Sequence, residues 1–306
     1  MGHNVEVPSL ASRLVPVVLR LTGRGKDLRS ADAARGHIAD RALRPLPYGP
    51  PRCLGRDIDV TVSHDNAWPV YTVAPTIAPA RHRAVYVHGG GWVNEIDPAH
   101  WRFVAELAVA SQTAVRVPIY PLVPWGTAGE VVPWVAGLVQ ADIDAVGAEN
   151  SYVLGDSAGG QIALSAVIWL RDNGGQQPRR AFLIAPALDL SLTNPAIAAV
   201  EPTDPWLSAA GVHEYVRHWR GTLSVQDPLV SPLSDTLTGL TAITMFSGTL
   251  DILNPDSRLL ADKARRAGVD IDYVEGGRMV HVYPLLPIPE GRAARRRITD
   301  TIMAGS

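Results

Sequence analysis

The sequence predicts an α/β fold in which helices cover both faces of a mostly parallel sheet. Short runs rich in valine, isoleucine and leucine recur along the chain, as in AVYVHGG, SYVLG and TAITMFSG. Stretches with helical spacing of apolar residues separate these runs. A strand that is apolar on both sides needs a helical layer on each face of its sheet. The length of 306 residues and the 46% hydrophobic content allow a large core.

The expected elements follow one another in a regular order. Residues 10–45 have helical spacing up to a proline-rich segment, and residues 57–73 alternate in polarity as a β-hairpin does. Strands are then expected at 84–90, 113–120, 151–155, 179–188, 241–248 and 270–276, and helices at 100–111, 129–146, 157–172, 255–268 and from about 290. Residues 191–235 carry two short helical patterns and no strand pattern, so we expect this insertion to form a lid over the strand ends.

Composition excludes several classes of function. A net charge of −2 gives no basic face for nucleic acid. Cys53 is the only cysteine, which rules out a disulfide framework and a cysteine-rich zinc site. His213 and His218 are five residues apart and do not share a helix face, so no metal site is expected. No organic cofactor is expected either.

The N-terminal stretch LASRLVPVVLRLTGRGK does not have the order of a signal peptide. Its apolar part is broken by Arg13, Pro16 and Arg20, and basic residues lie on both sides. We expect a short helix that packs on the body, with a membrane-surface helix as the less favoured alternative. No window holds 18 uninterrupted apolar residues, so we expect a cytoplasmic protein without stable membrane insertion.

A candidate nucleophile interrupts the apolar segment YVLGDSAGGQIAL. Residues 155–159 fit G-x-S-x-G, with a strand before and a helix after Ser157. One interpretation is an ordinary tight turn between a strand and a helix. In the other interpretation the flanking glycines permit a strained turn that exposes Ser157. The Ala158 N–H at the helix start then faces any negative charge that forms there.

A serine nucleophile needs a base and an orienting acid further along the chain. Asp251 follows the strand that ends near residue 248, and His281 follows the strand that ends near residue 276. Both therefore lie at the same sheet edge as Ser157. Asp256 is the competing acid, but its place at a helix start is typical of a cap.

The segment VHGGGW supplies a further candidate. Its consecutive glycines expose backbone N–H groups, and the alternative interpretation is a flexible turn. A phosphate cradle is excluded because no Lys-Ser/Thr follows. As an oxyanion hole, the amides of Gly89 and Gly90 would join that of Ala158.

The motifs HGGGW, GDSAGG, GTLDIL and MVHVYPLL occur here in order and at the expected strand ends. By these motifs the chain resembles the hormone-sensitive-lipase-like family of α/β-hydrolases, the bacterial esterases and acetyl-hydrolases, over about residues 55–303. The resemblance implies an α/β-hydrolase fold with a helical cap. The core would be residues 51–190 and 236–306, and the cap residues 1–50 and 191–235.

The resemblance also implies residue roles. Ser157 would be the nucleophile, His281 the base and Asp251 the orienting acid. The oxyanion donors would be Gly89, Gly90 and Ala158, with His88, Gly91, Trp92 and Asp156 in support. His88 would fix the glycine loop, and Asp156 would brace the turn or a neighbouring loop.

The chain departs from the family at YPLVPW, residues 120–125. Tyr120, Leu122 and Pro124 match, but Pro121 and Trp125 replace an arginine and a glutamate. We expect Trp125 to line the substrate channel. Three aromatic residues of the insertion could narrow the pocket or belong to the core: Trp206, Tyr215 and Trp219.

These residues predict a serine carboxylesterase that hydrolyses short- to medium-chain acyl esters through an acyl-enzyme on Ser157. Its partner would be a small ester substrate, and a homodimer is compatible with the sequence. One alternative is a ligand-binding protein that keeps the fold without turnover, as the plant gibberellin receptors illustrate. An amidase or peptidase of the same fold is the other.

Overall fold

A computed structural model of the chain describes residues 8–65 and 67–305 and contains one central eight-stranded sheet. Its strands are β1 (Ile58–Asp65), β2 (Trp68–Pro75), β3 (His82–Val87), β4 (Thr113–Pro118), β5 (Ser151–Asp156), β6 (Arg180–Ile184), β7 (Ala242–Gly248) and β8 (Ile271–Gly276). Their order across the sheet is β1-β2-β4-β3-β5-β6-β7-β8. β2 pairs antiparallel with β1 on one side and with β4 on the other, and all other strand pairs are parallel. The predicted hairpin and the mostly parallel sheet are confirmed.

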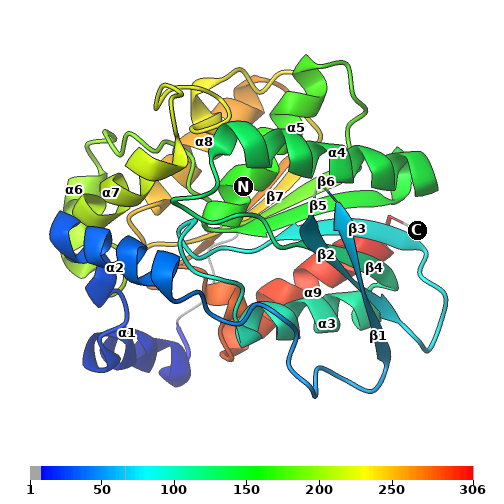
Figure 1. The fold of residues 1–306 in the computed structure, drawn as a ribbon, viewed down its shortest axis with the longest axis horizontal. Helices are drawn as coiled ribbons and strands as arrows, with labels where there is room; N and C mark the ends of the chain where they lie inside the picture. The colour runs from blue at the N-terminus through cyan, green and yellow to red at the C-terminus, as the bar shows by residue number, and fades with distance from the viewer. Residues whose placement is uncertain (1–7, 66, 306) are drawn as a thin grey trace.

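Helices cover both faces of the sheet, as the apolar strands predicted. The helices outside the insertion are α1 (Leu10–Thr22), α2 (Ala31–Leu43), α3 (Pro98–Ala110), α4 (Ala128–Val146), α5 (Ala158–Asp172), α8 (Asn254–Arg266) and α9 (Pro289–Met303). α4, α5 and α8 pack on one face of the sheet, and α3 and α9 on the other (Figure 1). The central strand β5 is buried along its whole length. This burial makes the end of β5 a rigid position for a reactive side chain.

The N-terminal region contains two helices where one helical stretch, 10–45, was predicted. Gly23 ends α1 in a left-handed conformation (φ 67°), and its N–H donates to the carbonyl of Arg20. Ser30 then starts α2, because its side chain accepts the N–H of Ala33. Glycine and serine thus impose a break that the apolar spacing alone did not reveal.

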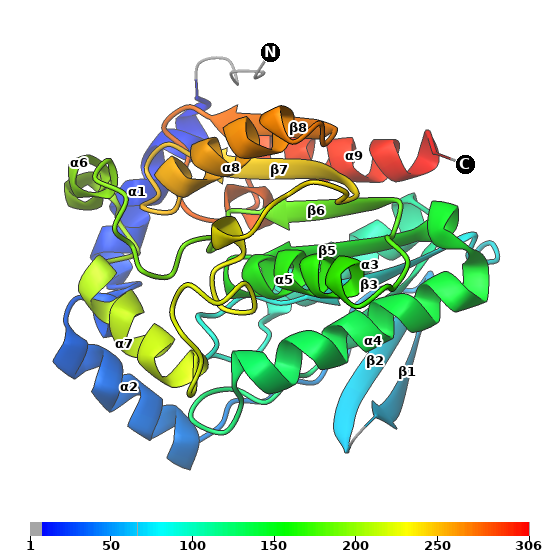
Figure 2. The same cartoon turned by 90° about the horizontal axis from the view of Figure 1, so that it is seen from above.

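The insertion 191–235 is helical and has no strand among its residues, as predicted. It contains α6 (Ile197–Val200) and α7 (Ala209–Trp219), and α7 packs against α2. α1, α2, α6 and α7 lie together at the end of the sheet where the parallel strands end (Figure 2). Segments far apart in the sequence therefore cover the same sheet edge.

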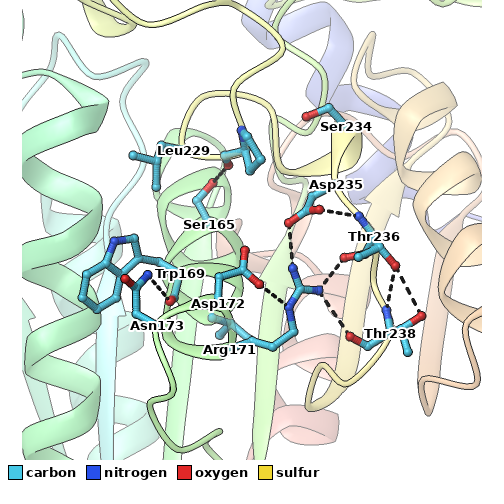
Figure 3. Close-up of polar contacts among 12 residues, drawn as sticks. Ser165, Trp169, Arg171, Asp172, Asn173, Leu229, Ser234, Asp235, Thr236 and Thr238 are labelled. Atoms are coloured by element: carbon cyan, nitrogen blue, oxygen red, sulfur yellow. Dashed lines mark hydrogen bonds and ion pairs between the residues drawn. The ribbon is translucent and has the colours of Figure 1, made fainter.

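The segment after α7 is tied to the end of α5 (Figure 3). The Arg171 guanidinium donates to the Asp235 carboxylate at 2.7 Å and to the Thr236 carbonyl at 2.6 Å. Closer to the start of α5, the Ser165 hydroxyl donates to the Pro228 carbonyl at 2.7 Å. These bonds fix the return of the insertion into the sheet.

Candidate active site

Ser157 lies on a strained turn between β5 and α5. Its backbone has φ 52° and ψ −118°, a conformation that costs a non-glycine residue on the order of 1–3 kcal/mol. The turn is too tight for side chains on its flanks. A Cβ on Gly155 would lie 2.2 Å from the Gly159 carbonyl oxygen, and one on Gly159 would lie 2.1 Å from that of Val87. The glycines of the motif are therefore required by packing, and the strain is retained at the position of the serine.

The structure brings Ser157, His281 and Asp251 into one hydrogen-bonded chain. His281 Nε2 lies 2.9 Å from Ser157 Oγ, and His281 Nδ1 lies 2.7 Å from Asp251 Oδ2. Asp251 also accepts the backbone N–H of Leu253 at 2.9 Å, which orients its carboxylate. Both Asp251 and His281 are buried. In this geometry His281 can take the hydroxyl proton of Ser157 while Asp251 holds the imidazole in one tautomer.

A second carboxylate, that of Asp204, lies beside the hydrogen-bonded series Ser157–His281–Asp251. The sequence did not predict it. Its Oδ1 accepts the N–H groups of Trp206 and Leu207 at 2.8 and 2.9 Å, and its Oδ2 accepts that of Ile252 at 2.9 Å. Burial, and then the charge of Asp251, raises the pKa of Asp204 to about 6. Asp204 thereby joins the insertion to the loop that carries Asp251. The sequence EPTDPW gives no signal of this contact, because it depends on how the insertion folds back.

The pKa of His281 reflects these carboxylates. Burial alone would lower it, but the hydrogen-bonded Asp251 and the charges of Asp204 and Asp156 raise it above its ordinary value. An imidazolium cannot accept the proton of Ser157. Activity should therefore fall as the pH drops through a pKa above the usual 6.5 of histidine.

Removing the charge of Asp204 should shift the acid limb of the pH–activity profile, the range in which activity falls as His281 becomes protonated. Asp204→Asn keeps an oxygen for the amides of Trp206 and Leu207 but no longer raises the pKa of His281. We expect the acid limb of kcat/KM to shift to lower pH, measured between pH 5 and 9 with a p-nitrophenyl ester. An unchanged limb would show that the Asp204 charge does not reach the imidazole.

Asp156 holds the glycine loop that follows β3. Its Oδ1 accepts the Tyr86 hydroxyl at 2.6 Å and the Gly89 N–H at 2.9 Å. A Cβ on Gly89 would lie 2.2 Å from Asp156 Oδ2, so only glycine fits there. The prediction that the Gly89 amide faces an oxyanion is wrong, because that N–H is already bound to Asp156.

The amides of Gly90 and Gly91 are placed differently. Among the hydrogen bonds of residues 8–65 and 67–305, none uses either N–H. Both glycines line the same cavity as Ser157 and Ala158, with φ of 115° and 65°. The sequence indicated a glycine loop, but three equivalent glycines could not reveal which amide Asp156 occupies.

His88 and Trp92 lie at the two ends of this loop. His88 Nδ1 donates to the Gly89 carbonyl at 2.6 Å, and its ring stacks on Tyr120 with centroids 4.6 Å apart. Burial, and then the nearby His100, lowers the pKa of His88 to about 4, so the ring is neutral. Trp92 donates from Nε1 to Gln161 Oε1 at 3.2 Å. These contacts hold the glycine loop in position. We assign neither side chain a role in the chemical step.

His100 is a further residue that sequence reasoning missed. Its Nε2 lies 3.3 Å from Asp156 Oδ2, and its Nδ1 lies 3.0 Å from both the N–H and Oδ1 of Asp97. Burial would lower the pKa of His100, but the charges and hydrogen bonds of Asp156 and Asp97 raise it to about 10. The Nε2 atom of His100 thus faces the carboxylate of buried Asp156. The Asp-x-x-His spacing at a helix start was the available signal.

A cavity of about 460 Å³ opens at Ser157 and His281. Trp206 and Tyr215 line it, and the Trp206 ring meets His281 edge-on with centroids 5.6 Å apart. Residues 23–28 of the N-terminal region form another part of its wall.

Two predicted pocket residues do not line this cavity. The prediction for Trp125 is wrong, since this side chain is 75% exposed and lies away from the lining. For Trp219, the core was one of the two predicted alternatives, and the structure agrees with it. Trp219 is fully buried, donates to Gln161 at 2.9 Å and stacks on Trp92 with centroids 5.6 Å apart. Trp219 thus belongs to the core.

Asp256, the competing acid, does not cap its helix. The N-cap position of α8 is Leu253, and Asp256 Oδ1 accepts the side-chain N–H of Asn194 at 2.8 Å. Burial raises its pKa to about 6. Within the part of the chain that the structure describes, no cluster of histidine, cysteine or carboxylate side chains could hold a metal ion. In that part, no helix is long and apolar enough to cross a membrane.

Comparison with known proteins gives consistent matches. Residues 84–285 match a family model described as alpha/beta hydrolase fold. A triacylglycerol lipase of Mycobacterium tuberculosis (strain ATCC 25618 / H37Rv) is 34% identical over 243 residues, which are 79% of this chain and 51% of the lipase. The chain thus spans about half the length of that relative.

Solved structures agree with the same fold. A putative esterase from Staphylococcus aureus has a TM-score of 0.84 and 26% identity, covering 90% of this chain and 93% of that one. An esterase described as belonging to the bacterial hormone-sensitive lipase family has a TM-score of 0.80 and 26% identity, covering 98% and 99%.

Proposed function

Since this chain belongs to the α/β-hydrolase-fold family, with relatives among the hormone-sensitive-lipase-like bacterial esterases, we propose that it is a serine carboxylesterase. The observation that carries the proposal is the hydrogen-bonded series from Ser157 Oγ through His281 to Asp251. It opens into a cavity that a small ester can enter. Two of the similar proteins, a triacylglycerol lipase and an esterase, support ester bonds as the target.

The first half of the reaction would transfer the acyl group to the enzyme. Ser157 Oγ attacks the ester carbonyl carbon while His281 Nε2 accepts its proton. The carbonyl oxygen becomes an oxyanion, which the amides of Gly90, Gly91 and Ala158 stabilise. Gly91 takes the place of Gly89 in the set of donors predicted from the sequence. Each such donor typically contributes about 3 kcal/mol to transition-state stabilisation. His281 then gives its proton to the departing alkoxide, and the alcohol leaves.

The second half would regenerate the enzyme with water. His281 takes a proton from the water, whose oxygen attacks the acyl carbon of the ester on Ser157. The tetrahedral intermediate forms in the same oxyanion site. When it collapses, the bond to Ser157 Oγ breaks, His281 returns the proton to this oxygen, and the carboxylic acid is released. Asp251 stabilises the imidazolium in both halves and is not itself protonated.

The cavity favours short- to medium-chain acyl esters as the substrate class. Its volume is at the lower end of the range for small-molecule sites, and its lining includes the apolar Leu207, Val212 and Leu285. Trp206 and Tyr215 add aromatic rings to this lining.

Hydrolysis rates for p-nitrophenyl esters from acetate to palmitate test this proposal. We expect a maximum of kcat/KM between the acetate and the octanoate and a decline beyond them, because longer chains exceed the cavity. A maximum at palmitate would overturn the chain-length proposal, and no hydrolysis of any ester would overturn the activity.

We further propose that residues 1–50 and 191–235 form the cap of this enzyme over the core of residues 51–190 and 236–306. The packing of α2 on α7 and the shared cavity wall support this division within the described residues. A cytoplasmic location is proposed as well. The single cysteine, Cys53, is an exposed free thiol, which suits a reducing compartment.

A further inference from the structure

Helix α1 packs on the protein through one face, and its opposite face is apolar and exposed. Its inner face carries Ser12 and Leu19, which are buried. The Ser12 hydroxyl donates to the Glu290 carboxylate, and the Ser9 N–H donates to the same carboxylate at 2.6 Å, which fixes the helix to the start of α9. The orientation of α1 is therefore set by specific contacts, so its outer face is presented to the surroundings in a defined way.

The outer face is a continuous apolar stripe. At 100° per residue its side chains fall within about 100° of arc, which is the width of a face that normally packs against a partner. The stripe consists of Leu10, Leu14, Val17, Val18 and Leu21, which are 78%, 61%, 48%, 53% and 82% exposed. Single exposed apolar residues are ordinary on protein surfaces, but a whole helix face of them marks an interaction surface.

The charges around the stripe identify the partner. Arg13 and Arg20 flank it on one side, and α1 contains no acidic residue. Three further basic residues, Arg24, Lys26 and Arg29, and one acidic residue, Asp27, lie within the seven residues that follow α1. An apolar helix face flanked by arginine is complementary to a bilayer surface, since the stripe enters the acyl boundary while the guanidinium groups reach the phosphates.

A basic cavity adjoins the end of this helix. It has a volume of about 400 Å³, and Arg20, Arg24 and Arg29 contribute to its wall. Glu201 and Asp204 also line it, but their carboxylates accept backbone N–H groups, Glu201 from Ala209 and Asp204 from Ile252. The cavity thus places three guanidinium groups and two hydrogen-bonded carboxylates beside the apolar stripe, and the arginines are the groups that would meet an anionic lipid headgroup.

We propose that the outer face of α1 is a peripheral docking surface for an anionic phospholipid bilayer. Gly23 and Arg24, directly after α1, form part of the wall of the cavity at Ser157. A protein docked through α1 would hold this cavity close to the lipid surface. The proposal does not depend on ester hydrolysis, and its test uses no activity measurement.

Sedimentation with vesicles tests the proposal on the full chain. We expect the wild type to bind vesicles of phosphatidylglycerol and phosphatidylcholine, and to bind pure phosphatidylcholine more weakly. Leu14→Ser with Leu21→Ser should lower partitioning by about tenfold or more, because two apolar anchors are lost. Arg13→Gln should lower binding to the anionic vesicles only, and salt should weaken that binding.

A matched control distinguishes binding through this helix face from nonspecific hydrophobic adsorption to vesicles. Ile77→Ser with Leu259→Ser removes two side chains that are 71% and 46% exposed elsewhere, and it should leave partitioning unchanged. Thermal unfolding should be the same for all variants, since the altered side chains are exposed. Wild type that stays in the supernatant with anionic vesicles would overturn the proposal, and so would wild-type partitioning of the Leu14/Leu21 variant. Light scattering that finds a wild-type dimer and a monomeric variant would overturn it too, because a second copy would then cover the stripe.

Discussion

Replacing Ser157 by alanine should lower kcat for p-nitrophenyl butyrate by about 10⁴-fold or more. The alanine has no oxygen to form the acyl-enzyme, and His281 Nε2 loses the hydroxyl that lies 2.9 Å away. Only binding and oxyanion stabilisation of a direct attack by water would remain. Because alanine is smaller and the backbone already tolerates a side chain at φ 52°, the fold should persist. Initial rates under substrate saturation, with circular dichroism of both proteins, measure this result.

Ser165→Ala is the matched control on the same helix. Its hydroxyl donates to the Pro228 carbonyl, so its loss should cost about 1 kcal/mol of stability and leave kcat within about twofold. If Ser157→Ala keeps most of the wild-type rate, the nucleophile lies elsewhere. If the wild type itself is inert, the non-catalytic ligand-binding alternative replaces the esterase.

The second large effect is expected for Asp251→Asn, which should lower kcat by about 10⁴-fold at neutral pH. The carboxylate accepts the Nδ1 proton of His281 at 2.7 Å and stabilises the imidazolium that forms during the reaction. An asparagine amide favours the tautomer with the proton on Nε2, which cannot accept the proton of Ser157. Single-turnover rates of acylation across the pH range measure this loss directly.

Asp256→Asn tests the competing acid under the same conditions. Asp256 bonds to Asn194 and makes no hydrogen bond to the imidazole of His281, so the variant should keep kcat within about threefold. A large loss in Asp256→Asn together with a small one in Asp251→Asn would reverse the assignment of the orienting acid.

The sheet could be predicted from the sequence because each strand carries its own signal. Apolar runs such as those of β5 and β7 are buried on both faces of the sheet. Once the strands are taken as parallel, the order of the chain shows at which edge of the sheet each strand ends. For the same reason the sequence alone predicts that Ser157, Asp251 and His281 lie at one edge of the sheet. Parallel strands in a right-handed α/β arrangement have their carboxyl ends at the same edge.

The pocket walls could not be predicted in the same way. Trp206, Trp219 and Trp125 look alike in sequence, but the first lines the cavity, the second is buried against Trp92 and the third is exposed. The positions of Trp206 and Trp219 depend on how the insertion packs against α2 and α5, and aromatic residue type carries no information about that packing.

The polar contacts behind the glycine loop were equally invisible. Asp156 accepts the N–H of Gly89, and its other carboxylate oxygen lies beside His100, on a helix that starts nine residues after Gly89. The sequence identified the loop and the support by Asp156, while the partner of each amide depends on three-dimensional packing.

Residues 23–28 form part of the wall of the cavity at Ser157, so the N-terminal region lies where a substrate would bind. Changes there can reshape the cavity without touching the sheet that holds Ser157, His281 and Asp251. Selectivity and chemistry can thus diverge independently, one through the N-terminal segment and one through strand ends more than a hundred residues away. For protein engineering, a library confined to residues 23–28 becomes a compact way to alter substrate preference, and an affinity tag close to this segment becomes a variable that needs its own control.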